Sequence, residues 1–333
     1  MKPLHTAILG CGGFAHRHAQ NLLTLSDEVQ MVAFCDTNPQ NAQAYAEKYT
    51  AGKAAIYTDL HELLEKQPLD LLLICLPPFA HSDEVTCAAQ RGIHIFIEKP
   101  IALTSEHAWQ MVADVEKSGI KTQVGFMFRF GEAIEELKAL IESGSAGRPG
   151  LMAARYFCNS LHAPWWRMRE KSGGQLVEQI IHMLDLMRYL LGEPAFVYSC
   201  QENLFHQHIP DYTVEDVSVT VVGFKNGALG TIHATNGAIP NRWINDYKVV
   251  TQNITAEFTN ANNASLFFTT EADTPQKTIA SERNVHLFEM RDLLHAIREN
   301  GPTRTPMSEG AKSLDLALAA RRSAEEHCKL TLD

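Results

Sequence analysis

The stretch that decides the fold is "LHTAILGCGGFAHRHAQNLL", residues 4–23. Residues 4–9 form a short apolar run typical of a buried strand, and the residues from Ala15 to about Leu25 have the composition of a helix. Between them lie Gly10 and Gly12, which complete the pattern Gly-x-Gly-x-x-Ala with Ala15. A strand, a glycine-rich turn and a helix in this order are typical of a dinucleotide-binding site.

Each small residue in this turn has its own physical role. Gly10 allows the tight turn, Gly12 lets the backbone approach the pyrophosphate, and Ala15 permits close packing of the helix on the strand. The N-terminus of the helix offers N–H donors and a positive dipole end to the phosphates. We therefore expect Gly10, Gly12, Gly13, Phe14 and Ala15 to bind the cofactor.

The type of dinucleotide is indicated by the end of the next apolar run. Residues 29–35 lead into Asp36, twenty-one residues after Ala15, where a carboxylate can accept hydrogen bonds from the adenosine ribose. Asp36 would also repel a ribose 2′-phosphate, and Thr37-Asn38 provides no basic side chain to hold one. These residues favour NAD over NADP. The alternative is a plain glycine-rich turn in which Asp36 caps the following helix.

The alternation of strands and helices continues through the first third of the chain. Strands are predicted at about 70–76, 93–98 and 121–126, and helices at about 81–91 and 104–118. This pattern predicts an α/β domain with a doubly wound parallel sheet, on which ligands bind beyond the carboxyl ends of the strands. The further cofactor contacts expected at that edge are Leu76, Pro77, His81, Glu98 and Lys99.

Lys99 is the basic residue of this edge. Pro100 biases Lys99 away from helical geometry and so holds it at the strand end. The alternative is a solvated surface lysine, as most lysines are.

After about residue 125 the rhythm of the sequence changes. Helices are predicted at 131–144, 286–299 and 308–327, and strands at 150–158, 195–203, 215–224, 228–236, 246–259 and 264–270. Strands that follow one another without helices predict an α+β domain with a large, mostly antiparallel sheet. We therefore divide the chain into a Rossmann domain, residues 1–124, and a substrate-binding and oligomerisation domain, residues 125–333. Many strands alternate apolar and polar residues, so a second subunit can cover one face, and we predict a homo-oligomer, a dimer or a tetramer.

One predicted helix in the second domain carries ionisable residues in an apolar context. The stretch "GGQLVEQIIHMLDLMRYLLGEP", residues 173–194, places Glu178, His182 and Asp185 at offsets of four and three, hence on one side of an α-helix. A buried polar network, metal ligation and catalysis are three interpretations of this stripe. No further ligand cluster supports a metal, and we predict none. His182 has a suitable pKa range for a general base, which Glu178 and Asp185 can orient, and Lys99 can stabilise alkoxide charge.

The ordered motifs add up to a family resemblance. "GCGGFA" at 10–15, "CD" at 35–36, "EKP" at 98–100, "GFMFRF" at 125–130 and "GGQLVEQIIHMLD" at 173–185 occur in one chain. This set resembles the glucose–fructose oxidoreductase / inositol dehydrogenase / MocA (Gfo/Idh/MocA) family. The resemblance implies a Rossmann domain, a C-terminal domain with an open-faced sheet often used for oligomer contacts, and NAD(P)-dependent redox chemistry on a sugar, polyol or similar compound.

The resemblance also implies roles for individual residues. The family's lysine of the Glu-Lys-Pro motif and its histidine of the Asp-x-x-x-His helix act at the substrate carbon, and they correspond to Lys99 and His182. The aspartate four residues before the histidine is Glu178 here, a departure that some members share. Asp185 either supports His182, contacts substrate or is a buried structural carboxylate.

Further substrate contacts are expected from the loop before this helix and from the "GFMFRF" segment. An indole face suits the C–H face of a sugar ring, and arginine suits a carboxylate or phosphate. The loop also holds His162 and Arg169. The alternative is that the tryptophans are packing residues and the arginines a solvated rim. The predicted substrate-binding set is Lys99, Arg129, Trp165, Trp166, Arg167, Glu178 and His182.

Composition excludes several classes of partner. The 333 residues are 45% hydrophobic and carry a formal net charge of −10, with no run of Lys and Arg, so neither nucleic acid nor a membrane surface is expected as a partner. The seven cysteines occur singly, and neither a signal-peptide layout nor a membrane-spanning apolar stretch is present, so we expect a cytoplasmic protein. The sequence predicts an NAD-dependent oxidoreductase acting on a secondary alcohol of a sugar, polyol or cyclitol. The alternatives are a glycoside hydrolase that uses transient oxidation by NAD, and a non-catalytic dinucleotide-binding regulator.

Overall fold

The computed structural model describes residues 2–270 and 272–332. Their contacts define two compact units. Unit 1 runs to Gly125 and includes His286–Ala311, whereas unit 2 comprises Phe126–Val285 and the chain from Lys312 onward. The chain first passes from unit 1 to unit 2 after Gly125, one residue from the predicted domain boundary. The segment His286–Ala311, which we expected in the second domain, packs instead in unit 1.

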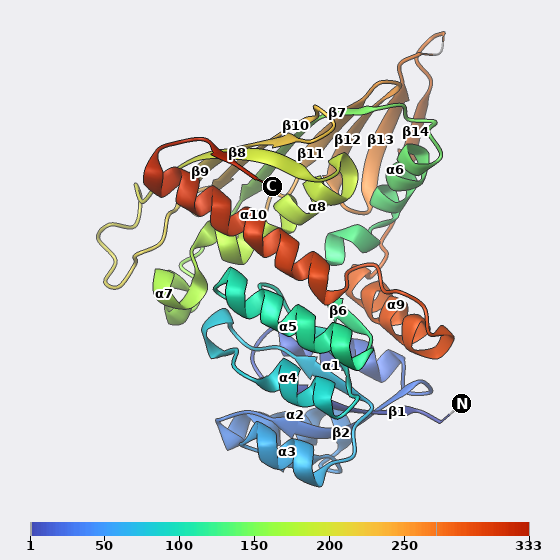
Figure 1. Cartoon of the computed structure of the whole chain (residues 1–333), viewed down its shortest axis with the longest axis vertical. Helices are drawn as coiled ribbons and strands as arrows, with labels where there is room; N and C mark the ends of the chain where they lie inside the picture. Colours follow the sequence, from blue (N-terminus) through green and yellow to red (C-terminus); the bar gives the residue numbers. More distant parts are fainter. Residues whose placement is uncertain (1, 271, 333) are drawn as a thin grey trace. The chain divides into compact units, whose positions relative to one another are not determined.

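Unit 1 is built on a parallel sheet of six strands (Figure 1). The strands are β1 (Leu4–Leu9), β2 (Val29–Cys35), β3 (Ala55–Tyr57), β4 (Leu71–Ile74), β5 (His94–Ile97) and β6 (Thr122–Val124). Their order is β3-β2-β1-β4-β5-β6, and every neighbouring pair is parallel. This is the doubly wound dinucleotide-binding order, and it confirms the predicted Rossmann fold.

The helices of unit 1 lie between its strands in sequence, except for α9, which comes from the segment that returns at His286. They are α1 (Ala15–Thr24), α2 (Pro39–Thr50), α3 (Leu60–Lys66), α4 (Glu84–Gln90), α5 (Ser105–Ser118) and α9 (Val285–Glu299). Strand β3 and helix α3 were not predicted, and α4 begins three residues later than expected because a 3-10 turn, Pro78–Ala80, precedes it. Helix α9 belongs to this unit because its buried side chains Met290, Leu293 and Leu294 share a hydrophobic core with strand residues of the sheet.

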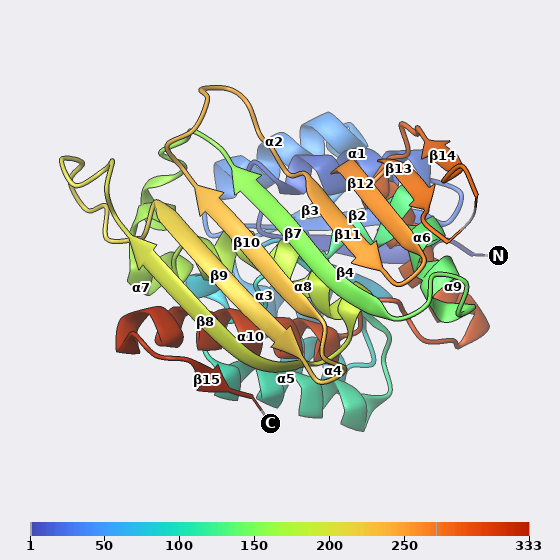
Figure 2. The same cartoon turned by 90° about the horizontal axis from the view of Figure 1, so that it is seen from above.

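Unit 2 contains a sheet of nine strands, seen face-on in Figure 2. The strands are β7 (Pro149–Phe157), β8 (Pro194–Glu202), β9 (Val217–Phe224), β10 (Leu229–Thr235), β11 (Tyr247–Thr251), β12 (Ile254–Asn260), β13 (Asn263–Phe268), β14 (Gln276–Ile279) and β15 (Leu330–Thr331). Their order is β14-β13-β12-β11-β7-β10-β9-β8-β15, and β7 with β10 is the parallel pair among otherwise antiparallel neighbours. The predicted mostly antiparallel sheet is confirmed.

The prediction of a single strand at 246–259 is wrong. The chain reverses after Thr251, and β11 pairs with β12 as an antiparallel hairpin. The Thr251 side chain supports the turn: its hydroxyl accepts from the backbone N–H of Ile254 at 3.1 Å and donates to the carbonyl of Ala146 at 2.7 Å. The turn contains no glycine or proline, so the sequence lacks the usual signal for it.

The two faces of this sheet differ. Helix α8 (Ile181–Leu191) packs on one face, where the absence of a side chain at Gly230 makes room for Met187. Unit 2 also contains α6 (Glu132–Glu142), α7 (Arg169–Ser172) and most of α10 (Met307–Glu326). Along β7, Met152, Ala154 and Tyr156 are buried while the residues between them are exposed. None of the helices in the described part of the chain has the length and apolar composition needed to cross a membrane.

Candidate active site

The turn between β1 and α1 has a shape that requires glycine. Gly10 has φ +88°, and a Cβ at this position would lie 2.5 Å from the carbonyl oxygen of Cys75. At Gly12 and Gly13 an added Cβ would meet no atom within 4 Å, so the backbone there is open to a ligand. Phe14, at the start of α1, provides no side-chain cap, which leaves N–H groups of the first turn available for an anion. This turn therefore fits the pyrophosphate of a dinucleotide.

Asp36 closes the same turn from the end of β2. Its Oδ2 accepts a hydrogen bond of 2.8 Å from the backbone N–H of Cys11, and its Oδ1 accepts from the N–H of Asn38 and from the side chain of Asn41. The cap of α2 is Asn38, whose side chain accepts from Gln40 N–H. An ionised carboxylate has about four acceptor positions, so Asp36 can still accept from a ribose hydroxyl.

Two further predicted cofactor segments follow the carboxyl ends of β4 and β5. Leu76 and Pro77 come after β4, and the loop ends at His81, whose Nδ1 lies 2.6 Å from Glu84 Oε1. Burial raises the pKa of Glu84, but hydrogen bonds from His81 and the backbone of Ser82 outweigh it, so the pKa is lowered overall.

Glu98 and Lys99 follow β5. Lys99 is half-buried, whereas Glu98 is buried and its Oε1 lies 2.6 Å from His18 Nε2 on α1. The sequence analysis assigned no role to His18. The one signal for it is a histidine within the nucleotide-binding helix, spaced three residues from Ala15.

In unit 2, the predicted uniform α-helix at 173–194 is wrong in its first half. Gly173 and Gly174 have positive φ, residues Leu176–Ile180 form a π-helical turn, and the α-helix begins at Ile181. Buried Glu215 supports this start: its Oε1 accepts from Leu176 N–H at 2.7 Å, and its Oε2 lies 2.6 Å from where a Cβ of residue 174 would be. A π-helical turn at this point is informative because such turns are frequent at functional sites.

Glu178 lies in the π-helical turn and is oriented by Trp166. The indole Nε1–H donates to Glu178 Oε2 at 2.7 Å, and the Trp166 ring is buried against Tyr212 and Val214. Burial, followed by the Glu178 charge, raises the pKa of the neighbouring Cys158 to about 12, so this thiol stays protonated. The hydrogen bond from the buried Trp166 indole holds the Glu178 carboxylate in one orientation.

His182 lies one turn further, on α8. His182 is only 6% exposed. Its ring packs against two rings of the "GFMFRF" segment, with centroid distances of 6.2 Å to Phe126 and 5.3 Å to Phe128. Aromatic walls restrict the ring and limit its access to water.

Asp185 and Arg129 pair with one another. Arg129 donates from Nε to Asp185 Oδ2 at 2.8 Å and from Nη2 to Oδ1 at 2.6 Å, and Ser313 donates to Oδ1 at 3.0 Å. Both charged residues are buried, and the guanidinium also lies 4.7 Å from the ring centroid of Tyr189. Each charge is the counter-charge of the other, which gives the pair a structural role, and the catalytic role of Asp185 and the substrate contact of Arg129 stay predictions.

Arg167, one of the predicted substrate contacts, stabilises the loop that precedes the π-helical turn. Arg167 donates to the carbonyl oxygens of Leu161 at 2.7 Å and His162 at 3.1 Å, so its guanidinium supports the loop backbone. The His162 ring lies 4.2 Å from that of Trp166, and Trp165 is half-buried beside the same cluster.

Comparison with known proteins agrees with this geometry. The family described as "Oxidoreductase family, NAD-binding Rossmann fold" matches residues 4–126, and the GFO/IDH/MocA C-terminal domain matches residues 134–266. The chain is 32% identical to D-glucoside 3-dehydrogenase of Escherichia coli, over 68% of each chain. It belongs to the Gfo/Idh/MocA family.

Two further proteins are similar to this Gfo/Idh/MocA chain over its full length. Myo-inositol 2-dehydrogenase of Thermotoga maritima is 26% identical over 99% of both chains. The solved structure of levoglucosan dehydrogenase in complex with NADH and levoglucosan has the same fold, with a TM-score of 0.91 at 21% identity over 100% of both chains. The protein is accordingly an NAD-dependent oxidoreductase of the Gfo/Idh/MocA family.

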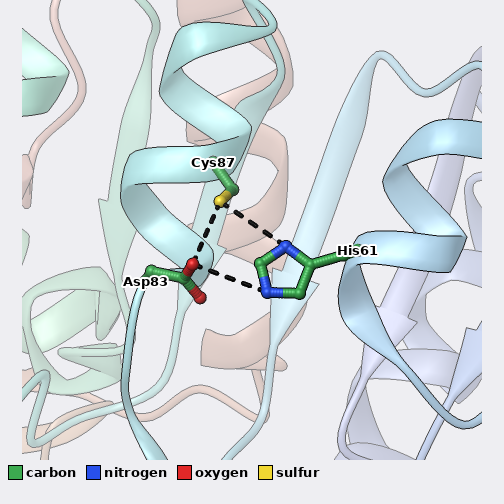
Figure 3. A group of neighbouring side chains, drawn as sticks. All are labelled: His61, Asp83 and Cys87. Carbon is green, nitrogen blue, oxygen red and sulfur yellow. Dashed lines mark hydrogen bonds and ion pairs between the residues drawn. The ribbon is translucent and has the colours of Figure 1, made fainter.

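Two groups of side chains in unit 1 of this Gfo/Idh/MocA protein have metal-ligand chemistry, and the sequence analysis weighed neither. His18, Glu98 and Glu289 form the buried group. Figure 3 shows the other, in which His61 from α3 meets Cys87 of α4 and Asp83, the residue before that helix. Cys87 Sγ lies 3.9 Å from Nδ1 of His61, but Asp83 Oδ2 lies 3.5 Å from Nε2, so opposite edges of the ring face the two partners. The group is an exposed polar network, and the expectation of no metal stays a prediction.

Proposed function

We propose that this protein transfers a hydride between a secondary alcohol of a sugar, polyol or cyclitol-like compound and NAD. The observation that carries the proposal is the support given to Glu178 and His182. A buried helix presents a carboxylate fixed by Trp166 and an imidazole enclosed by Phe126 and Phe128, in a chain whose other unit has an NAD turn. Such support is typical of groups held for chemistry.

The proposed roles follow from the chemistry of alcohol oxidation. His182 takes the hydroxyl proton as general base. NAD, when bound, would supply the acceptor for the hydride of the carbon that bears this hydroxyl. Lys99 holds the substrate oxygen and stabilises the negative charge that develops on it. Glu178 orients His182 or accepts a hydrogen bond from a substrate hydroxyl. Trp165 provides an apolar face for the ring carbons, Trp166 acts by fixing Glu178, and Arg167 acts by holding the loop.

The remaining cofactor assignments keep the predicted set. Gly10, Gly12, Gly13, Phe14 and Ala15 would hold the pyrophosphate, and Asp36 the adenosine ribose. Leu76, Pro77, His81, Glu98 and Lys99 would line the remainder of the dinucleotide site beyond β4 and β5.

A substrate panel tests the proposal. Inositols, glucosides, anhydrosugars and sugar acids are offered with NAD and with NADP, and the absorbance of the reduced cofactor is followed. We expect NADH formation with at least one cyclic polyol or sugar. Hydrolysis of an activated glycoside without net NADH would instead support the transient-oxidation alternative, and tight NAD binding without any turnover would support the regulator. The two curated relatives described above favour neither alternative, because both are named dehydrogenases.

A homo-oligomer, a dimer or a tetramer, is also proposed, with the exposed sheet face as its contact. Leu151, Leu229 and Val250 are neighbours in register across β7, β10 and β11, and each is between 36% and 45% exposed. Light scattering should report a mass above one subunit, and Leu229→Lys should lower it. A cytoplasmic location is supported by the seven cysteines, all of which are free thiols.

A further inference from the structure

Four ionisable side chains meet in the interior of unit 1. His18 comes from α1, Glu98 from the end of β5, and His286 and Glu289 from α9. His18 Nε2 lies 2.6 Å from Glu98 Oε1, and His286 Nδ1 lies 3.1 Å from Glu289 Oε1. Ligand atoms of His18, Glu98 and Glu289 all lie within 4.8 Å of one another, and all four residues are buried. The sequence analysis gave no role to three of them.

The two carboxyl groups carry different charges. Burial raises the pKa of Glu98, but the hydrogen bond and charge of His18 outweigh it and the pKa is lowered, so Glu98 is ionised. Burial and then the Glu98 charge raise the pKa of Glu289 well above its usual value, so Glu289 is a neutral acid. His286 is also neutral, because burial lowers its pKa to about 4. Close buried carboxyls divide in this way because both cannot ionise without a large cost.

Glu98 is held on several sides. Its Oε2 accepts from the backbone N–H of Lys99 at 3.3 Å, and it would lie 2.8 Å from a Cβ at Gly125, so residue 125 must be small. His18 lies on the helix that starts at the glycine-rich turn, and Glu289 on the returning segment 286–311. The carboxylate thus joins the cofactor helix to the main chain at Lys99.

We propose that His18 and Glu289 are positioning residues that fix the ionised Glu98 carboxylate, and through it the Lys99 main chain, in the geometry needed for turnover. His18 supplies the hydrogen bond that holds the carboxylate, and Glu289 supplies a neutral wall beside it. The proposal rests on the function proposed for Lys99, and it assigns a catalytic contact to neither residue.

Steady-state kinetics with matched variants test this proposal. His18→Gln and Glu98→Gln should lower kcat by about 10- to 100-fold, the cost typical of losing a partner that orients a functional group, and His18→Gln should leave the NAD dissociation constant little changed. Glu289→Gln should keep most of kcat because it replaces one neutral group by another, whereas Glu289→Leu should lose it. His295→Gln, an exposed histidine on the same helix α9, is the control. If these residues had a structural role alone, the variants would lose thermal stability but would not show a fall in kcat at unchanged NAD affinity.

A second measurement does not depend on turnover. Lysine modification by pyridoxal phosphate and borohydride, mapped to Lys99 by peptide mass spectrometry, reports the surroundings of this amine in each variant. We expect the modification rate to change in His18→Gln and Glu98→Gln and to match the wild type in Glu289→Gln and His295→Gln. If no substrate in the panel reacts, the proposed function fails while this arm still decides the positioning role. Unchanged rates in all variants would overturn the inference.

The same group contains ligand types that a divalent cation accepts. Metal analysis of the purified protein separates this possibility from the proposal. We expect no stoichiometric metal; one equivalent of a divalent ion that is lost in Glu289→Gln would overturn the assignment of Glu289 as a neutral wall.

Discussion

The glycine-rich turn of unit 1 and the π-helical turn of unit 2 both prepare a site, but by different means. The first is shaped by its own backbone: φ of +88° at Gly10, open space at Gly12 and Gly13, and one carboxylate, Asp36, from the next strand. The second is shaped by side chains from elsewhere, with Glu215 at its start and Trp166 on Glu178. The cofactor turn is therefore shaped locally, whereas the turn that holds Glu178, the proposed substrate contact, depends on contacts from distant parts of the sequence.

The largest effect expected concerns the imidazole of the second site. His182→Ala should lower kcat by about 10²- to 10⁴-fold, the usual contribution of a general base, and leave NAD binding unchanged. Loss of turnover with an unchanged NAD dissociation constant would show that His182 acts in the chemical step and not in cofactor binding. His233→Ala, an exposed histidine on β10, is the control. Normal rates from His182→Ala would end its assignment as the base.

The buried pair beside His182 should matter for stability. Asp185→Asn leaves the Arg129 charge buried without its counter-charge, which costs about 3–5 kcal/mol in the free energy of unfolding. Denaturant titration measures this loss. Glu257→Gln, which breaks an exposed pair with Lys248, should cost less than ~1 kcal/mol. A large fall in kcat for Asp185→Asn with unchanged stability would restore its catalytic assignment.

The neutral carboxyl of unit 1 predicts a pH dependence. The unfolded chain releases the Glu289 proton near pH ~4.3, but the folded chain retains it to a higher pH because the pKa is raised. This contribution to stability is complete below the unfolded pKa and falls by about 1.4 kcal/mol per pH unit above it, until the folded pKa is reached. Glu289→Gln should lack this slope above the unfolded pKa. Equal slopes in wild type and variant would show that Glu289 is ionised in the fold.

The smallest effect concerns cofactor choice. Asp36→Ser removes a charged acceptor, so the KM for NAD should rise about 10-fold and the preference for NAD over NADP should narrow. Asp27→Ser, an exposed aspartate with the same change in net charge, should leave both unchanged. An unaltered preference in Asp36→Ser would assign the discrimination to other residues.

The contrast between local and distant contacts also explains which parts of the fold could be predicted from the sequence. The Rossmann order follows from apolar runs, glycines and the position of Asp36, which are all local signals. The short strand β3 and the turn after Thr251 escaped because neither has a strong pattern. The π-helical turn escaped because Glu215, which supports its first N–H, lies thirty-nine residues from Leu176.

Burial and pairing also escaped the sequence analysis. Arg129 and Asp185 are fifty-six residues apart, and each has the chemistry of a site residue when read alone. Their pairing, which the sequence pattern does not reveal, gives them a structural role as well. His18 and Glu289 stand among ordinary helical residues, and only the fold reveals that both lie beside Glu98.

The return of His286–Ala311 to the first unit has a practical consequence for protein engineering. A fragment ending at Gly125 would lack Met290, Leu293 and Leu294 from its hydrophobic core and would expose apolar surface in their place. Autonomous expression of the nucleotide-binding half therefore calls for a fusion in which a linker joins both segments. Chimaeras that exchange cofactor preference between relatives should likewise transplant the two pieces together.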